Sequence, residues 1–145
     1  MQHAQDALPF VREIPHTADA GFTVEAPTRD GCFERAALAL ADVIADTRTI
    51  ATRERRELCV AGDDAESQLH DLLHALLLLG QLEGFLISAV EVLAAGPRTL
   101  RVVVAGEPYD PARHRLHGEV KAVTWHELSV APTDDGWRAR VILDV

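Results

Sequence analysis

Two oxygen-rich residues at the end of the chain are the first candidates for chemistry. Asp144 stands in an apolar, strand-like segment, and Val145 follows it with main-chain carboxylate oxygens. Two acidic groups this close repel each other unless a cation or strong hydrogen-bond donors lie nearby. Hard divalent cations prefer such carboxylate and main-chain oxygens as ligands. The pair therefore suggests a metal site, although a frayed chain end with a solvated Asp144 fits the same residues.

A second acidic candidate is Asp19, in the segment HTADAG at residues 16–21. It lies directly before a predicted strand, where a carboxylate is also a common turn former. Spacing alone does not bring Asp19 and Asp144 together. A shared cation site is therefore a hypothesis that needs the fold.

Histidines offer a weaker alternative for metal binding. His70 and His74 are four residues apart on a predicted helix, so they share one face and could chelate a transition metal. No third ligand accompanies them, and polar residues beside a leucine stripe are the commoner reason for such a pair. His114 and His117 lie in an arginine-rich loop, where they could belong to a partner surface.

Several enzyme and targeting signals are missing from the sequence. It contains no G-x-S-x-G elbow, no Walker loop and no dinucleotide fingerprint. Cys32 and Cys59 match no metal or redox spacing, so both are predicted to be buried thiols. No signal peptide is recognisable, and the longest apolar run, residues 75–79, is far too short for a membrane span. We therefore expect a cytoplasmic protein with no membrane partner.

Composition describes a globular, acidic protein. The chain has 145 residues, and 23 acidic against 14 basic residues give a formal charge of −9. Its length predicts a single domain over residues 1–145, with 1–12 as a loose N-terminal segment. An acidic surface repels phosphate, so tight direct binding of nucleic acid is not expected, whereas a basic partner or a hard cation is. Lys121 is the single lysine among the basic residues, either because an ammonium is needed there or by chance.

Hydrophobic periodicity predicts two helices, over residues 30–45 and 64–82. Asp30 is the expected N-cap of the first helix, and Asp63 with Glu66 has the spacing of a capping box for the second. Six segments are predicted strands: 21–24, 56–60, 86–94, 100–104, 119–130 and 137–145. Because strands outnumber and separate the helices, the predicted fold is α+β, a two-layer domain with a largely antiparallel sheet and both helices packed on one face.

Alternation of side chains assigns faces within the last two predicted strands. In the long strand 119–130, Lys121 and His126 lie on opposite faces. In the last strand, Ile142 and Asp144 share the face opposite to most of the apolar side chains. Asp144 is therefore a carboxylate within an apolar strand, next to the last residue of the sequence.

An ordered set of motifs resembles the archease family from residue 13 to residue 145. The similar segments are HTADAG at 16–21, a first helix at 31–41 with Phe33 as its aromatic residue, GE-x-x-D-x-x-x-H at 106–114, KAVTWH at 121–126 and ILDV at 142–145. Tryptophan replaces the usual tyrosine in the KAVTWH segment. No single motif is decisive, but their order along nearly the whole chain is specific.

The resemblance implies a small α+β accessory protein rather than an enzyme. Archeases assist the RtcB-type RNA ligase, which joins tRNA halves during splicing and seals other broken RNAs. They promote guanylylation of that ligase and allow it to turn over more than once. We therefore expect an RtcB-type ligase as the partner.

The family also carries a metal site, usually with calcium. By motif match, the resemblance implies that its ligands here are Asp19, Asp144 and Val145. Residues that could support this site or contact the partner are His16, Lys121 and His126.

The sequence departs from the family at one position, and two other functions fit the same residues. Ala75 stands where the second helix of the family usually carries a glutamate, so the role of that glutamate is absent or replaced. A metal-dependent hydrolase could use the same acidic cluster with His16 or His126 as general base. A general chaperone or interaction module would instead expose a large apolar patch.

Overall fold

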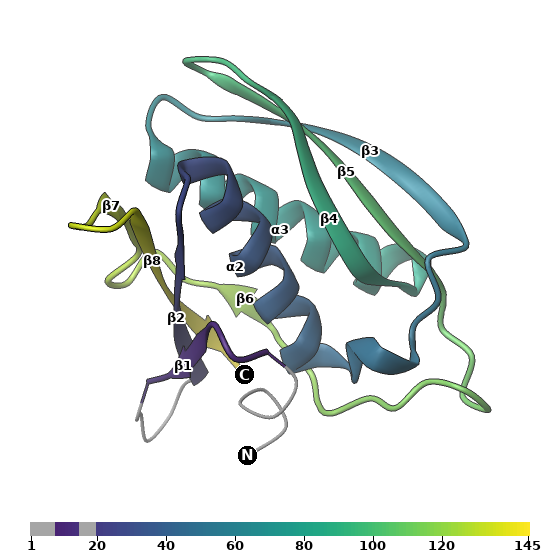
Figure 1. Ribbon diagram of the computed structural model, residues 1–145. Helices are drawn as coiled ribbons and strands as arrows, with labels where there is room; N and C mark the ends of the chain where they lie inside the picture. Colours follow the sequence, from purple (N-terminus) through teal and green to yellow (C-terminus); the bar gives the residue numbers. More distant parts are fainter. Residues whose placement is uncertain (1–7, 15–19) are drawn as a thin grey trace.

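The computed structural model describes residues 8–14 and 20–145, in which two helices lie between two antiparallel sheets (Figure 1). The helices are α2 (Arg29–Ile44) and α3 (Ala65–Glu83), with a short 3₁₀ turn η1 (Thr47–Thr49) after α2. The first sheet contains, in order, β1 (Val11–Glu13), β2 (Ala20–Ala26), β8 (Trp137–Asp144) and β6 (Ala122–Val123), and β7 (Ser129–Pro132) also pairs with β8. The second sheet contains β3 (Glu54–Ala61), β5 (Thr99–Pro108) and β4 (Phe85–Ala95).

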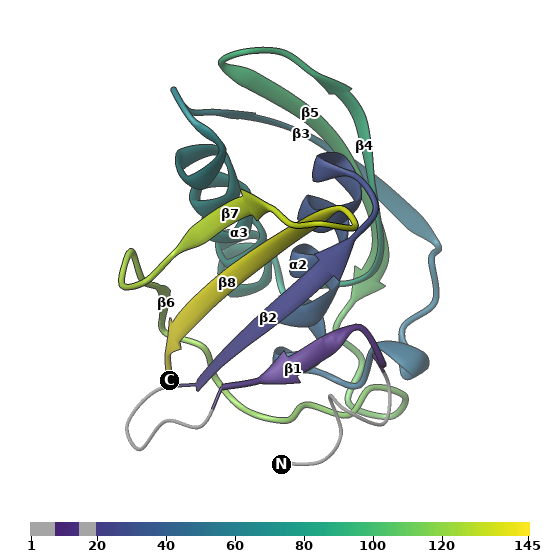
Figure 2. The ribbon, with the colours of Figure 1, turned by 60° about the vertical axis from the view of Figure 1, so that its left-hand side comes forward.

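The α+β class, the antiparallel pairing and the two predicted helices are confirmed. The strands divide into two sheets, however, and the helices are covered on both sides. Helix α2 packs against β2 and β8 on one side and against β4 on the other, with α3 beside it (Figure 2). Helix α3 likewise contacts β3, β4 and β5 of the second sheet and β6 and β7 of the first. A helix between two sheets needs apolar residues around most of its circumference, which explains why the leucines of α3 extend beyond one narrow stripe.

Helix α2 begins at Arg29 because Thr28, and not Asp30, is its N-cap. The Thr28 hydroxyl accepts a hydrogen bond from the N–H of Gly31 at 3.0 Å. The predicted apolar face of the helix packs into the core: Phe33, Ala36, Ala37 and Leu40 are fully buried, and Val43 and Ile44 are partly buried. The helix therefore supports β2 by packing against the buried face of the first sheet.

Helix α3 is capped at its N-terminus by Asp64, so the prediction of Asp63 as the capping residue is wrong. The Asp64 carboxylate accepts a hydrogen bond from the N–H of Ser67 at 2.7 Å, and this bond lowers the pKa of Asp64. Glu66, the expected second member of a capping box, instead accepts from the N–H of Val130 at 2.9 Å and ties β7 to the helix. The predicted leucine stripe is buried, and it consists of Leu69, Leu72, Leu73, Leu76 and Leu77.

The prediction of one long strand over 119–130 is wrong. Val123 lies opposite Leu143 in the pairing of β6 with β8, and Ser129 lies opposite Arg140 in the pairing of β7 with β8. The chain therefore advances six residues from Val123 to Ser129 while the paired positions on β8 advance only three. The extra residues bulge away from the sheet between the two short strands.

Ile142 is buried although it shares its face of β8 with Arg138, Arg140 and Asp144. A Cβ atom on Gly21 would come within 2.8 Å of Ile142 Cδ1 and 3.2 Å of Ile14 Cδ1, so these three residues pack directly together. Val11, in the segment expected to be loose, is buried in β1 and pairs with Val24. This unpredicted strand extends the sheet beyond β2.

Candidate functional site

The free end of β8 lies at one edge of the first sheet, where three segments of the chain meet. Ala20 and Leu143 form the last pair between β2 and β8, and Ala122 pairs with Asp144 on the other side. The N–H of Lys121 donates to the main-chain oxygen of Asp144 at 2.7 Å. The backbone of Asp144 is therefore fixed in the sheet and is not frayed.

The side chain of Asp144 is exposed and makes no hydrogen bond or ion pair with any residue that the structure describes. Val145 follows it and is 44% exposed. The other proposed ligand, Asp19, and the proposed supporting residue His16 lie outside the described residues. Their roles remain predictions.

The donor atoms at this edge are hard oxygens, and their chemistry fits calcium rather than a soft metal. Within residues 8–14 and 20–145, no three His, Cys, Asp or Glu side chains gather closely enough to hold a metal ion. The ligand set that the family resemblance implies is Asp19, Asp144 and Val145. Because Asp19 lies outside these ranges, the set stays a prediction.

Lys121 and His126 both lie in the segment that runs past this edge. Lys121 contributes its N–H to the end of β8, and its side chain is exposed. His126 is exposed, and its Nε2 lies 3.4 Å from the Glu127 carboxylate. Glu127 in turn accepts a hydrogen bond from Arg140 at 2.6 Å. The acidic neighbour of His126 in the structure is thus Glu127.

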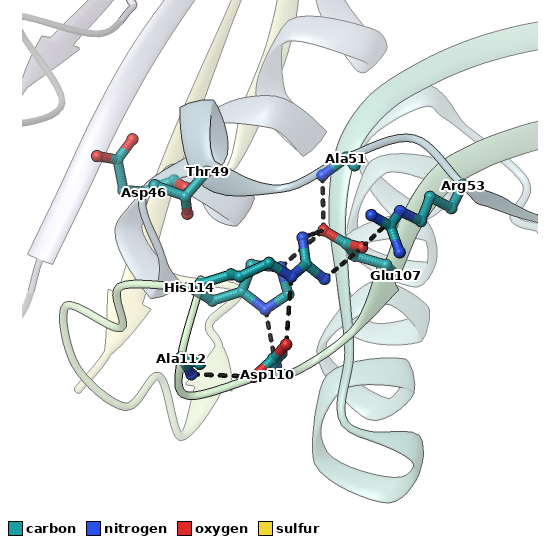
Figure 3. A network of polar contacts seen from close by, with 9 residues as sticks. Asp46, Thr49, Ala51, Arg53, Glu107, Asp110, Ala112 and His114 are labelled. Atoms are coloured by element: carbon teal, nitrogen blue, oxygen red, sulfur yellow. Dashed lines mark hydrogen bonds and ion pairs between the residues drawn. The ribbon is translucent and has the colours of Figure 1, made fainter.

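A second carboxylate, Glu107 at the end of β5, stands at the centre of a polar network (Figure 3). Arg113 donates to both of its oxygens, at 3.0 and 2.7 Å. Its Oε2 also accepts from the ring of His114 at 2.8 Å and from the N–H of Ala51 at 2.7 Å. Arg53 approaches to 3.5 Å. Glu107 is only 2% exposed, so every donor here replaces lost water.

The hydrogen bonds from Arg113, followed by those from His114 and Ala51, hold the pKa of Glu107 far below its ordinary value. The His114 ring is held on both sides, since its Nδ1 accepts from the N–H of Asp110 at 2.8 Å. Its Nε2 must therefore carry the proton that Glu107 accepts. The network is a neutral imidazole and a guanidinium closed around one carboxylate.

Asp110 completes this network from its outer side. Its carboxylate accepts from the N–H of Ala112 at 2.9 Å and from Arg113 at 3.2 Å, and these bonds lower the pKa of Asp110. The expectation that His114 lies on a partner surface is wrong, because its side chain is buried. The GE-x-x-D-x-x-x-H spacing was the available signal for this network, since its glutamate, aspartate and histidine meet here.

The remaining sequence candidates do not belong to any group of three metal-ligating side chains in the described part of the chain. His70 and His74 stack at 6.2 Å between ring centroids, and the Nε2 of His70 lies 2.9 Å from the Val123 carbonyl oxygen, which it can only donate to. Burial raises the pKa of the Cys32 thiol to about 11. Cys59 is exposed on β3, so its predicted burial is wrong.

Fold and site first define the class of this protein: an α+β protein with two helices between two antiparallel sheets and a free carboxylate at one sheet edge. The chain belongs to the archease family, because the model of the Archease protein family matches residues 12–145. The helices that the structure describes all fall short of the length and apolar character needed to cross a membrane.

Relatives from archaea carry the same family name. Protein archease of Methanopyrus kandleri is 40% identical, over 92% of this chain and 97% of that protein. Protein archease of Pyrococcus furiosus is 37% identical, over 90% of this chain and 94% of that protein.

Solved structures share the fold. The solution structure of Methanobacterium thermoautotrophicum protein 1598 is similar with a TM-score of 0.79 at 31% identity, over 95% of this chain and 100% of that one. The crystal structure of an archease from Thermotoga maritima, described as a possible chaperone, has a TM-score of 0.64 at 19% identity, over 92% of this chain and 96% of that one. The second likeness concerns the fold alone.

Proposed function

We propose that this chain is a cytoplasmic accessory protein of an RtcB-type RNA ligase in tRNA splicing and RNA repair. It promotes guanylylation and multiple turnover of the ligase and catalyses no reaction itself. Its working site is a calcium-binding cluster made of Asp19, Asp144 and a main-chain oxygen of Val145. Membership of the archease family supports the partner, and the geometry at the end of β8 supports the site.

The observation that carries the proposal is the pairing of Ala20 with Leu143. Asp19 is bonded to Ala20, and Asp144 is bonded to Leu143. Consecutive Cα atoms are about 3.8 Å apart, so each aspartate starts one residue from the same paired position. Two segments that are more than a hundred residues apart in sequence thus support one small oxygen-rich site.

The free carboxylate of Asp144 is the second support. A carboxylate without a donor among the described residues keeps its lone pairs for a ligand, and its exposure costs little because water solvates it. Calcium bound there would supply a concentrated positive charge at the edge of the sheet. Asp144 would hold that charge in place, since its own backbone is fixed by Lys121 and Ala122.

The charge of the whole chain supports the kind of partner. A formal charge of −9 disfavours RNA as a direct ligand and favours a protein with a basic surface. An enzyme that binds RNA must present such a surface. The accessory protein is therefore expected to contact the ligase rather than the RNA.

A multiple-turnover RNA ligation assay with the cognate ligase tests this function. We expect the wild-type protein to increase the number of turnovers and Asp144→Ala to abolish that increase at any concentration. Asp135→Ala is the matched control, because Asp135 is an exposed aspartate in the turn before β8. Equal stimulation by Asp144→Ala and wild type would refute the proposed site. Hydrolysis of phosphoesters by the pure protein with metal would favour the hydrolase instead.

A further inference from the structure

Trp125 is an exposed aromatic residue in the bulge between β6 and β7. Its side chain is 60% exposed, although a tryptophan of this size normally contributes to a core or an interface. The bulge follows directly on β6, which pairs with the end of β8 at Asp144. Trp125 therefore lies in the segment that borders the proposed metal site.

The indole ring is held flat on helix α3. It stacks on the ring of His70, with 3.8 Å between the centroids and 9° between the planes. His70 is itself fixed by its hydrogen bond to the Val123 carbonyl oxygen. His74 extends the stack one turn further along the helix. One face of Trp125 is thus used for positioning.

The backbone of the bulge is also fixed. The N–H and the hydroxyl of Thr124 both donate to the Ile142 carbonyl oxygen at 3.0 Å. Glu127 has a φ of 52°, an unusual value for a residue with a side chain, and its carboxylate is held by Arg140. Since ring and backbone are fixed before any partner arrives, binding on Trp125 loses little conformational freedom.

The charge of the chain indicates the kind of group that Trp125 receives. Glu127 lies two residues after Trp125 in the same bulge, and the backbone of Asp144 pairs with Ala122, three residues before Trp125. Arg140 is already paired with Glu127. The face of an indole ring attracts cations, and the formal charge of −9 on the chain favours a basic partner and repels phosphate.

We propose that Trp125 is the anchor through which the basic protein partner docks, by receiving an arginine or lysine side chain on the indole. Rigid aromatic residues at the centre of interfaces carry a large share of the binding free energy. The anchor places the partner beside Asp144. In this respect the inference rests on the proposed function and adds the contact that seats the ligase.

Calorimetric titration of the full chain into the cognate ligase tests the anchor. We expect Trp125→Ala to raise Kd by at least about tenfold and Trp125→Phe to recover much of the loss. Leu82→Ala is the matched control, because Leu82 is a large apolar residue that is 79% exposed on α3, and it should change Kd by less than about twofold. An unchanged Kd for Trp125→Ala would overturn the inference.

The ligation assay separates this inference from the proposed function. At saturating concentration, Trp125→Ala should stimulate turnover as wild type does, because Asp144 is intact, whereas Asp144→Ala should fail to stimulate at any concentration. Loss of stimulation by Trp125→Ala even at saturation would overturn the anchoring role. A wild-type protein that binds without stimulating would overturn the proposed function alone, and one that does not bind would overturn both.

A nucleobase is the rival ligand for an exposed indole. Fluorescence of Trp125 in a Trp137→Phe background, titrated with a single-stranded RNA oligonucleotide and no ligase, distinguishes the two. We expect no saturable change in fluorescence. Saturable quenching by the RNA alone would overturn the protein-anchor assignment in favour of base stacking.

Discussion

Glu107 and Asp144 are both carboxylates at the ends of central strands, and the structure treats them in opposite ways. Glu107 lies at the end of β5 and is almost completely buried. Its carboxylate accepts hydrogen bonds from Arg113, His114 and Ala51. Asp144 ends β8 in solvent and has no protein donor among the described residues. A carboxylate whose lone pairs are all used fixes the fold. One whose lone pairs are free is available for a ligand.

The two regions also differ in what they hold together. Glu107 joins the segment after η1 to the loop after β5, because Ala51 comes from the first and Arg113 and His114 come from the second. Among the described segments, Asp144 joins strands through its backbone and not through its side chain. Changes at the first region should therefore act on stability, and changes at the second should act on ligand binding.

The largest effect is expected next to Glu107, at Gly106. A Cβ atom there would lie 1.8 Å from the Leu86 carbonyl oxygen and 2.8 Å from the Ile87 Cα atom, so β4 and β5 could not keep their pairing. We expect Gly106→Ala to lower the thermal midpoint by more than about 10 °C or to prevent folding. Circular dichroism measures this. Gly118→Ala is the control, since nothing lies within 4 Å of its added Cβ, and an equal loss there would contradict the explanation.

Removal of the buried carboxylate should have the next largest effect. Glu107→Ala leaves the Arg113 guanidinium without its main partner, and we expect the thermal midpoint to fall by about 5–10 °C. Glu107→Gln keeps part of the hydrogen bonding and should lose less. The exposed Glu91→Ala in β4 should change little. A midpoint for Glu107→Ala that matches that of Glu91→Ala would show that the network contributes nothing to stability.

Acid should weaken the same network. Because the folded-state pKa of Glu107 is lowered by its donors, its contribution is complete above the unfolded-state pKa of about 4.3 and is lost as the pH falls below it. Urea unfolding between pH 7 and pH 3 should show a smaller decline in Glu107→Gln than in wild type. The decline should not vanish, since the pKa of Asp110 is lowered too. Parallel profiles would contradict the role of Glu107.

The smallest effect on stability is expected at Asp144. With calcium removed by a chelator, Asp144→Asn should unfold within about 1 °C of the wild-type midpoint, because its side chain makes no hydrogen bond or ion pair within residues 8–14 and 20–145. Differential scanning calorimetry measures the difference. A large loss would mean that Asp144 belongs to the structural class of carboxylates together with Glu107.

Local patterns predicted the helices well and the bulge poorly. The burial of Leu69 and Leu73 follows from helical spacing alone, since a helix has one regular period. The break after Val123 depends on how β6 and β7 share the edge of β8, which is a long-range matter. Alternation alone likewise gives no sign that Ile142 is buried, because it packs beside Ile14 from a segment more than a hundred residues away in sequence.

The candidate site was accessible from sequence only through the family motifs. The sequence shows Asp144 and Asp19 as candidate carboxylate ligands. Whether they are close in space depends on the pairing of Ala20 with Leu143, which spacing does not reveal. The Glu107 network was missed as such, because the Ala51 N–H that completes it is 56 residues away and carries no side-chain signal. Main-chain donors are invisible in a sequence until the fold is known.

Calorimetric titration of the protein with calcium tests the central claim most directly. The account predicts one ion bound per wild-type chain, at least about tenfold weaker binding to Asp144→Asn, and wild-type affinity in Asp135→Asn. If calcium does not bind the wild-type chain, or binds Asp144→Asn with equal affinity, the free carboxylate at the end of β8 is not a metal ligand.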